Sequence, residues 1–119
     1  MFSSAKHVDH NMNPILSDHT REIAELCSKY QVLRLEAFGS VVGTDFDAAS
    51  SDVDLIAVFA APREPGYADR YMDFAQALES LFGRKVDLLT PGAIRNQRFA
   101  ETLKRQAVPI YDAQEYQAA

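Results

Sequence analysis

The sequence predicts an α/β (α+β) fold in which helices pack against a mixed four-stranded sheet. Apolar residues recur at intervals of three and four in three stretches, and four shorter stretches rich in strand-forming residues are bounded by Gly, Pro or polar turns. Because helices connect the second strand to the third and the third to the fourth, we expect them to lie against the sheet. Within the 119 residues, we expect a flexible N-terminal arm over residues 1–13 and one domain over residues 14–119.

The first part of the chain predicts one helix and one strand before a polar loop. From Pro14 to Tyr30 the apolar residues form a helical stripe, with acidic residues early and a lysine late, which suits the helix dipole. Val32 to Phe38 predicts a strand that Gly39 ends in a tight turn, and Ser40 is placed to cap a short helix. The stretch from Thr44 to Ser51 is rich in Asp, Ser and Ala, so we expect a surface loop there.

The middle of the chain predicts a central strand and a long helix. Val53 to Ala60 is an apolar run without alternation, as in a strand that is covered on both faces. Tyr67 to Phe82 carries a second helical stripe, and Gly83 stands where a left-handed C-terminal cap is favoured. We expect the aromatic residues at helical spacing mainly in the core, and a partner surface is the alternative. These residues are Tyr67, Tyr71, Phe74 and, further along the chain, Phe99.

The last part predicts two short strands around a further helix. Lys85 to Leu89 predicts a strand, and Thr90-Pro91 has the pattern of an N-cap followed by proline at a helix start. We expect that helix to be broken near Asn96. Val108 to Tyr111 predicts the final strand.

The composition is that of an ordinary globular protein, and it narrows the possible functions. The formal net charge is −5, whereas surfaces that bind nucleic acid directly need clustered Lys and Arg. The single cysteine, Cys27, lies on the apolar stripe of the first helix, so we expect it in the core and expect no internal disulfide. No stretch resembles a signal peptide or approaches the roughly 20 apolar residues that cross a membrane. We therefore expect a cytoplasmic protein.

Two aspartates stand at the beginning of the predicted central strand. Asp52 and Asp54 are two residues apart, so their side chains project to the same face, roughly 6.5 to 7 Å from one another. Carboxylates placed together beside an apolar run repel each other and resist desolvation unless a cation lies between them. Mg²⁺ is the natural candidate, because it prefers carboxylate oxygens and keeps positions open for water and substrate phosphates.

A third carboxylate and a phosphate-binding bend complete the predicted site. Asp87 alternates with core residues in the next strand, so it can meet Asp52 and Asp54 if the two strands are neighbours. Three converging carboxylates can hold two metal ions about 3.5 to 4 Å apart, which suits phosphoryl or nucleotidyl transfer. Gly39 lets a phosphate approach the backbone, and Ser40 adds a hydroxyl donor beside the amides of a helix start.

Each part of this pattern also has a structural explanation. Gly39-Ser40 is a common turn, Asp52 can cap or turn the chain before Asp54, and Asp87 can be an edge residue paired with Lys85. Taken singly, these explanations are favoured. Taken together at this spacing, the residues favour a site that binds a nucleoside triphosphate with metal ions.

The combination of Gly39-Ser40, a polar loop, and Asp52-x-Asp54 leading into an apolar strand resembles the DNA polymerase beta nucleotidyltransferase superfamily. The small size is similar to its minimal nucleotidyltransferase (MNT) branch. The resemblance implies the nucleotidyltransferase fold, with Asp52, Asp54 and Asp87 as metal ligands and catalytic residues for two Mg²⁺ ions. It also implies that Gly39 and Ser40 contact the triphosphate of ATP and that Asp87 helps to activate the attacking hydroxyl.

The same resemblance implies a protein partner. Proteins of the MNT branch are similar to antitoxins that pair with a HEPN RNase toxin and transfer AMP from ATP to a tyrosine of that toxin. Two alternatives stay open. Val41-Val42 stands where the family commonly has a polar residue, and the longer loop adds Asp45 and Asp47, so the chain could neutralise its partner by binding alone. It could also modify a small molecule such as an antibiotic.

Overall fold

The computed structural model describes residues 13–42 and 52–118. The loop predicted from Thr44 to Ser51 and residues 1–12 of the predicted arm over residues 1–13 therefore lie outside the described residues. Along the chain the elements are α2 (Pro14–Ser17), α3 (Thr20–Lys29), β1 (Val32–Phe38), the 3-10 helix η1 (Gly39–Val42), β2 (Val53–Phe59), α4 (Tyr67–Phe82), β3 (Val86–Leu89), the 3-10 helix η2 (Pro91–Ala93), α5 (Gln97–Gln106), β4 (Val108–Asp112) and α6 (Ala113–Ala118).

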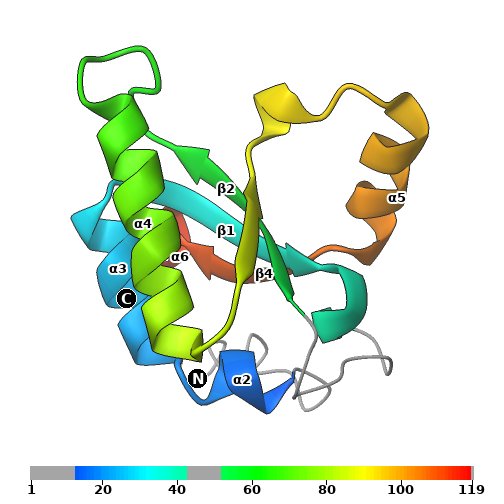
Figure 1. The fold of residues 1–119 in the computed structure, drawn as a ribbon, viewed down its shortest axis with the longest axis horizontal. Helices are drawn as coiled ribbons and strands as arrows, with labels where there is room; N and C mark the ends of the chain where they lie inside the picture. Colours follow the sequence, from blue (N-terminus) through cyan, green and yellow to red (C-terminus); the bar gives the residue numbers. More distant parts are fainter. Residues whose placement is uncertain (1–12, 43–51, 119) are drawn as a thin grey trace.

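The four strands form one mixed sheet in the order β3-β2-β1-β4 (Figure 1). Strand β1 is antiparallel to both β2 and β4, whereas β2 and β3 are parallel. A parallel pair needs a crossover connection, which α4 provides between β2 and β3. The predicted mixed sheet with helices packed against it is confirmed.

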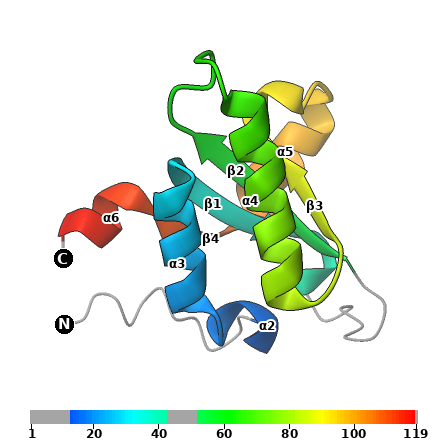
Figure 2. The same cartoon turned by 60° about the vertical axis from the view of Figure 1, so that its left-hand side comes forward.

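The two faces of the sheet are covered differently. Helices α3 and α4 lie side by side on one face, and α5 lies on the opposite side (Figures 1 and 2). The main core lies under α3 and α4 and includes the fully buried Leu35, Leu55 and Phe74. A smaller cluster under α5 consists of Phe38, Ile56 and Leu103. The second face therefore has only a small apolar cover, and side chains beside it remain accessible.

The predicted boundaries of the central elements agree closely with the structure. Strand β1 and helix α4 begin and end at the predicted residues. Gly83 caps α4 in the left-handed region with a φ of 67°. Strand β2 is buried on both faces as predicted, because neighbouring residues such as Leu55 and Ile56 are both buried.

The predicted helix from Pro14 to Tyr30 is wrong in one respect, because the structure has two helices there. The Asn13 side chain accepts a hydrogen bond from the Ile15 N–H and caps α2. His19 then leaves the helical conformation, with a φ of −124°, and its Nδ1 lies 2.9 Å from the Ile15 carbonyl oxygen. The chain restarts as α3, whose apolar stripe packs on the main core.

The C-terminal elements agree in order and differ in detail. The break near Asn96 is confirmed, because its side chain accepts a hydrogen bond from the Phe99 N–H at the start of α5. Thr90-Pro91 begins a single 3-10 turn, and the Thr90 side chain makes no cap bond. Helix α6 was not predicted, since its six residues are too few for a helical repeat.

Most of the residues predicted for the core are found there. Cys27 is fully buried, and burial raises the pKa of its thiol, which agrees with a core residue. Phe74 is fully buried, whereas Tyr67 and Tyr71 are half-buried with their rings against Phe59. The prediction for Phe99 is wrong, because this side chain is 38% exposed and packs against Phe38 at the edge of the smaller cluster. Within the described residues, no helix is both long and apolar enough to cross a membrane.

The packing of Phe74 gives a test of the core. Its ring lies 5.7 Å from that of Phe59 and 6.0 Å from that of Tyr30. Phe74→Ala should lower the free energy of unfolding by about 3–5 kcal/mol, because it leaves a cavity between α4 and the sheet. Urea denaturation measures this loss. Met72→Ala, on the same helix but 54% exposed, should change stability by about 0.5 kcal/mol or less, and equal losses would contradict the assigned core.

Candidate active site

Asp54 and Asp87 stand side by side on the second face of the sheet. They are register partners in the parallel pair of β2 and β3, and on the other side of Asp54 its partner in β1 is Phe38. Side chains of such partners point to the same face. The structure therefore brings together two of the three carboxylates that the sequence predicted.

The two carboxyl groups interact strongly. Burial, the charge of Asp87, a hydrogen bond with Asp87 and the charge of Asp52, in that order, raise the pKa of Asp54 to about 6. When Asp54 carries the proton it donates this hydrogen bond to Asp87. When both groups are ionised, two negative charges lie next to each other in a partly buried site. A bound cation would relieve that repulsion.

The bend at Gly39 closes the site on the side of β1. Gly39 follows Phe38 directly and has a φ of +74°, in the left-handed region. A Cβ at this position would overlap the Asp54 carboxylate oxygen Oδ2. Glycine is therefore needed both for the backbone conformation and for the close approach to Asp54.

The bend is anchored by the residues that follow it. Val41 is 1% exposed and belongs to the main core, and Val42 packs against that core. Ser40, between Gly39 and Val41, is half-buried at the start of η1. In the sequence, Val41 stood out only because the family commonly has a polar residue at this position that can contact phosphate. In the structure this valine fastens the bend to the core.

The donor set fits a hard cation such as Mg²⁺ in part. Asp54 and Asp87 present carboxylate oxygens in contact with each other, and Asp52, half-buried just before β2, influences Asp54 through its charge. In residues 13–42 and 52–118, no three His, Cys, Asp or Glu side chains form a ready metal-binding group. The three-carboxylate centre therefore stays a prediction, in which Asp52 would have to move closer when a metal ion binds.

A groove lies on the same face of the sheet as the aspartates. Its volume is about 480 Å³, within the size range of small-molecule sites. Ile56, two residues after Asp54 in β2, lies in its wall. The lining residues are Arg34, Glu36, Ile56, Val58, Pro91, Leu103, Lys104, Ala107 and Pro109. The sequence did not predict this groove, because its walls come from segments far apart in the chain. The one signal was the alternation of side chains along β1 and β2, which places every second residue of each strand on the same face of the sheet.

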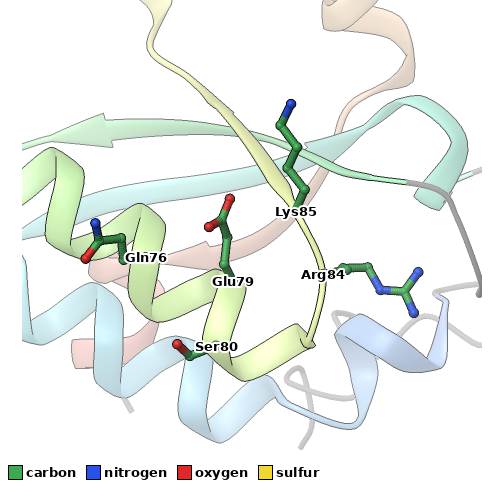
Figure 3. Close-up of a pocket in the computed structure, with 5 residues that line it drawn as sticks. All are labelled: Gln76, Glu79, Ser80, Arg84 and Lys85. Atoms are coloured by element: carbon green, nitrogen blue, oxygen red, sulfur yellow. The ribbon is translucent and has the colours of Figure 1, made fainter.

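Helix α5 forms one side of this region. The ring of Phe99 packs edge-on against Phe38, with centroids 5.9 Å apart, which places the start of α5 beside the Gly39 bend. A second depression, of about 750 Å³, lies between the last turns of α4 and the residues that lead into β3 (Figure 3). It is shallow and open, and neither Asp54 nor Asp87 lines it. Neither aspartate lines the groove under α5 either, but Ile56 in its wall stands on the same face of β2 as Asp54. The groove under α5 is therefore the cavity that suits the site.

Substitution of the bend glycine tests the close approach to Asp54. Gly39→Ala should destabilise the protein more than Gly83→Ala, because both glycines have a positive φ but only at Gly39 would the new methyl group meet a neighbour. Each change should cost about 1 kcal/mol for the backbone conformation. Urea denaturation measures both losses of stability. The additional loss in Gly39→Ala, relative to Gly83→Ala, should disappear when Asp54 is also replaced by alanine. Equal losses for the two single variants would contradict the geometry.

The raised pKa of Asp54 predicts a pH-dependent stability. In the unfolded chain an aspartate ionises near pH 3.9, whereas folded Asp54 ionises at about 6, so its ionisation costs the folded state stability as the pH rises through this window. Asp54→Asn should therefore raise the free energy of unfolding by about 1 kcal/mol at neutral pH, after allowance for solvent screening. The gain should vanish towards pH 4.

Urea denaturation in metal-free buffer at several pH values measures this effect. Asp73→Asn, an exposed aspartate of α4, removes the same charge away from the site and serves as the control. A gain for Asp54→Asn that is the same at every pH would contradict the assigned environment.

Comparison with known proteins agrees with this geometry. A protein of Methanocaldococcus jannaschii named "putative protein adenylyltransferase" is 27% identical over 96 residues, covering 81% of this chain and 91% of that protein. A solved structure described as "Structure of putative minimal nucleotidyltransferase" has a TM-score of 0.65 at 26% identity and covers 85% of this chain and 99% of its own.

A complex of the tri-AMPylated HEPN toxin of Shewanella oneidensis with its MNT antitoxin contains the same fold. Its TM-score is 0.57 at 17% identity, with 87% of this chain and 77% of the other covered. The family model described as "Nucleotidyltransferase domain" matches residues 21–110. This range includes β1, β2 and β3 and with them Asp52, Asp54 and Asp87. The chain belongs to the nucleotidyltransferase domain family and is a nucleotidyltransferase enzyme.

Proposed function

We propose that this chain is a Mg²⁺-dependent adenylyltransferase and the antitoxin of a HEPN RNase toxin, to which it transfers AMP from ATP on a tyrosine. The observation that carries the proposal is the contact between Asp54 and Asp87 next to the Gly39 bend. The AMPylated toxin in the related complex and the name of the archaeal relative support the choice of AMP and of a protein acceptor.

The Gly39 bend and the aspartates would bind different parts of the substrate. Backbone amides and the Ser40 hydroxyl at the start of η1 would bind the β and γ phosphates. Asp52, Asp54 and Asp87 would hold Mg²⁺, which when bound neutralises charge on the phosphates and the leaving group. The groove that begins at Ile56 would receive the rest of the nucleotide or the acceptor side chain.

The transfer itself needs one proton acceptor. The oxygen of the acceptor hydroxyl forms a bond to the α-phosphorus of ATP, and the bond from that phosphorus to the pyrophosphate oxygen breaks. The hydroxyl proton passes to the Asp87 carboxylate, which is exposed and so accessible to an incoming acceptor. The products are AMP in a phosphodiester bond to the acceptor, and pyrophosphate.

The acceptor would come from another molecule. On the described face the chain offers a groove of about 480 Å³, which can admit a single side chain but not a folded acceptor domain. A protein acceptor that presents one tyrosine fits this space. The buried, reduced Cys27 is compatible with the cytoplasm that we propose as the compartment.

Two other functions remain distinguishable by experiment. Val41 and Val42 pack in the core instead of offering a polar contact to phosphate, which favours a module that neutralises its partner by binding alone. The groove favours a transferase for a small-molecule acceptor. We prefer protein adenylylation, because Asp54 and Asp87 are brought together as catalysis would need and binding alone would not. The AMPylated toxin of the related complex and the name of the archaeal relative support a protein acceptor.

Intact-mass spectrometry of the HEPN partner tests the proposal. After incubation with this chain, ATP and Mg²⁺, the partner should gain the mass of AMP at a tyrosine. Asp54→Asn or Asp87→Asn should slow the transfer by about 10²–10³-fold or more, because each removes charge stabilisation of the reacting phosphates. Removal of Mg²⁺ with a chelator should stop it.

Asp73→Asn should keep full transfer, since its side chain is exposed on α4. Neutralisation of the toxin with no added mass would reject the reaction in favour of binding alone. AMP transfer to a small acceptor but not to the partner would favour the small-molecule enzyme.

A further inference from the structure

Strand β3, which carries Asp87, lies at the edge of the sheet. It has four residues and, among the strands of residues 13–42 and 52–118, it pairs with β2 alone. The Val53 N–H donates a hydrogen bond of 3.0 Å to the Lys85 carbonyl, so the main chain of Lys85 and, by alternation, of Asp87 faces β2. The main chains of Val86 and Leu88 therefore face outward, where no further strand can bond them.

Two side chains of α4 bond these outward-facing groups. The Tyr71 hydroxyl donates to the Leu88 carbonyl. The Val86 N–H donates to Glu79 Oε2 over 3.1 Å, and Figure 3 shows Glu79 extending from α4 towards the beginning of β3. Tyr71 and Glu79 are eight residues apart, slightly more than two helical turns, so they lie on one side of α4. We call this pair the α4 clamp.

The α4 clamp bonds the main chain on both sides of Asp87. We propose that Tyr71 and Glu79 are positioning residues that hold β3 so that the Asp87 carboxylate stays against Asp54. This inference rests on the proposed function, because it gives these two residues a role in that same site. Both belong to α4, the helix that covers the opposite face of the sheet (Figures 1 and 2).

The strand needs this support for a physical reason. A pair of short strands is only marginally stable by itself, and β3 is parallel, which is slightly less stable per residue. The buried Val86 and Leu88 hold β3 against α4, and the ladder to β2 sets the register of β3 from its inner side. The two hydrogen bonds from α4 add fixed points on its outer side. A shift of about 1 Å at a catalytic group can cost about 10²-fold in rate.

The first experiment measures AMP transfer by Tyr71→Phe and Glu79→Ala. Each should lower kcat about tenfold, as for other residues that orient a reactive group. The KM for ATP should change less than about twofold, because the Gly39 bend that binds the phosphates is on the far side of Asp54. Glu79→Gln, which keeps an oxygen acceptor for the Val86 N–H, should retain most of the activity.

The second experiment does not depend on AMP transfer. Mn²⁺, a probe for the Mg²⁺ site, should bind Tyr71→Phe and Glu79→Ala about tenfold more weakly than wild type. Hydrogen exchange of the Val86 amide should become faster in Glu79→Ala but not in Glu79→Gln. Tyr67→Phe is the matched control, since it removes a hydroxyl one turn earlier on α4 from a ring that contacts Phe59, and it should leave kcat and Mn²⁺ affinity unchanged.

The outcomes separate the two proposals. If wild type binds Mn²⁺ and the clamp variants weaken it, but no AMP is transferred, the proposed function fails and the positioning role stands. Unchanged Mn²⁺ affinity and kcat in Tyr71→Phe and Glu79→Ala would overturn the positioning role, as would a wild type that binds no Mn²⁺. If Glu79→Ala does not fold, Tyr71→Phe decides.

Discussion

The contact between the Asp54 and Asp87 carboxyl groups is the interaction on which the proposed site depends. It joins two strands that are adjacent in space but separated in sequence by α4. Burial and, after it, the neighbouring charge of Asp87 raise the pKa of Asp54 to about 6, so ionised Asp54 costs the folded protein stability at neutral pH. The apolar core under α3 and α4 offsets this cost from the other face of the sheet. Stability and chemistry are thus separated onto opposite faces.

The same contact explains why the residues around it are constrained. Gly39 must lack a side chain, because Asp54 occupies that space. Val41 must be apolar, because the bend after Gly39 is fastened into the core. The side of the site that we propose for polyphosphate is therefore fixed by packing, while the side that we propose for the acceptor is open at the exposed Asp87. This asymmetry suits an enzyme that binds a small nucleotide first and then receives an acceptor from another molecule.

Much of this architecture could be predicted from the sequence, because it depends on local patterns. The helical stripe of α4, the apolar run of β2 and the alternation around Asp87 each reflect the side-chain period of one element. Placing Asp54 beside Asp87 required only one further assumption, that the strands around α4 are neighbours. The break at His19 could not be predicted, since the bond from its ring to the Ile15 carbonyl has no periodic signal. The groove likewise depends on tertiary contacts between separate elements.

The α4 clamp illustrates the limit of such prediction most clearly. In the sequence Tyr71 and Glu79 are ordinary residues of an amphipathic helix. Their hydrogen bonds to the main chain of β3 become evident only when β3 is placed at the edge of the sheet. A parallel pair requires a crossover helix, and that helix must cover one face of the sheet. It therefore passes close to the unpaired edge, where its side chains can bond the strand while the opposite face stays free for substrate. One helix can then connect β2 to β3, cover the core and hold the strand that carries Asp87. Substitutions of Tyr71 and Glu79 in α4 should therefore change the rate of the proposed transfer through the position of β3.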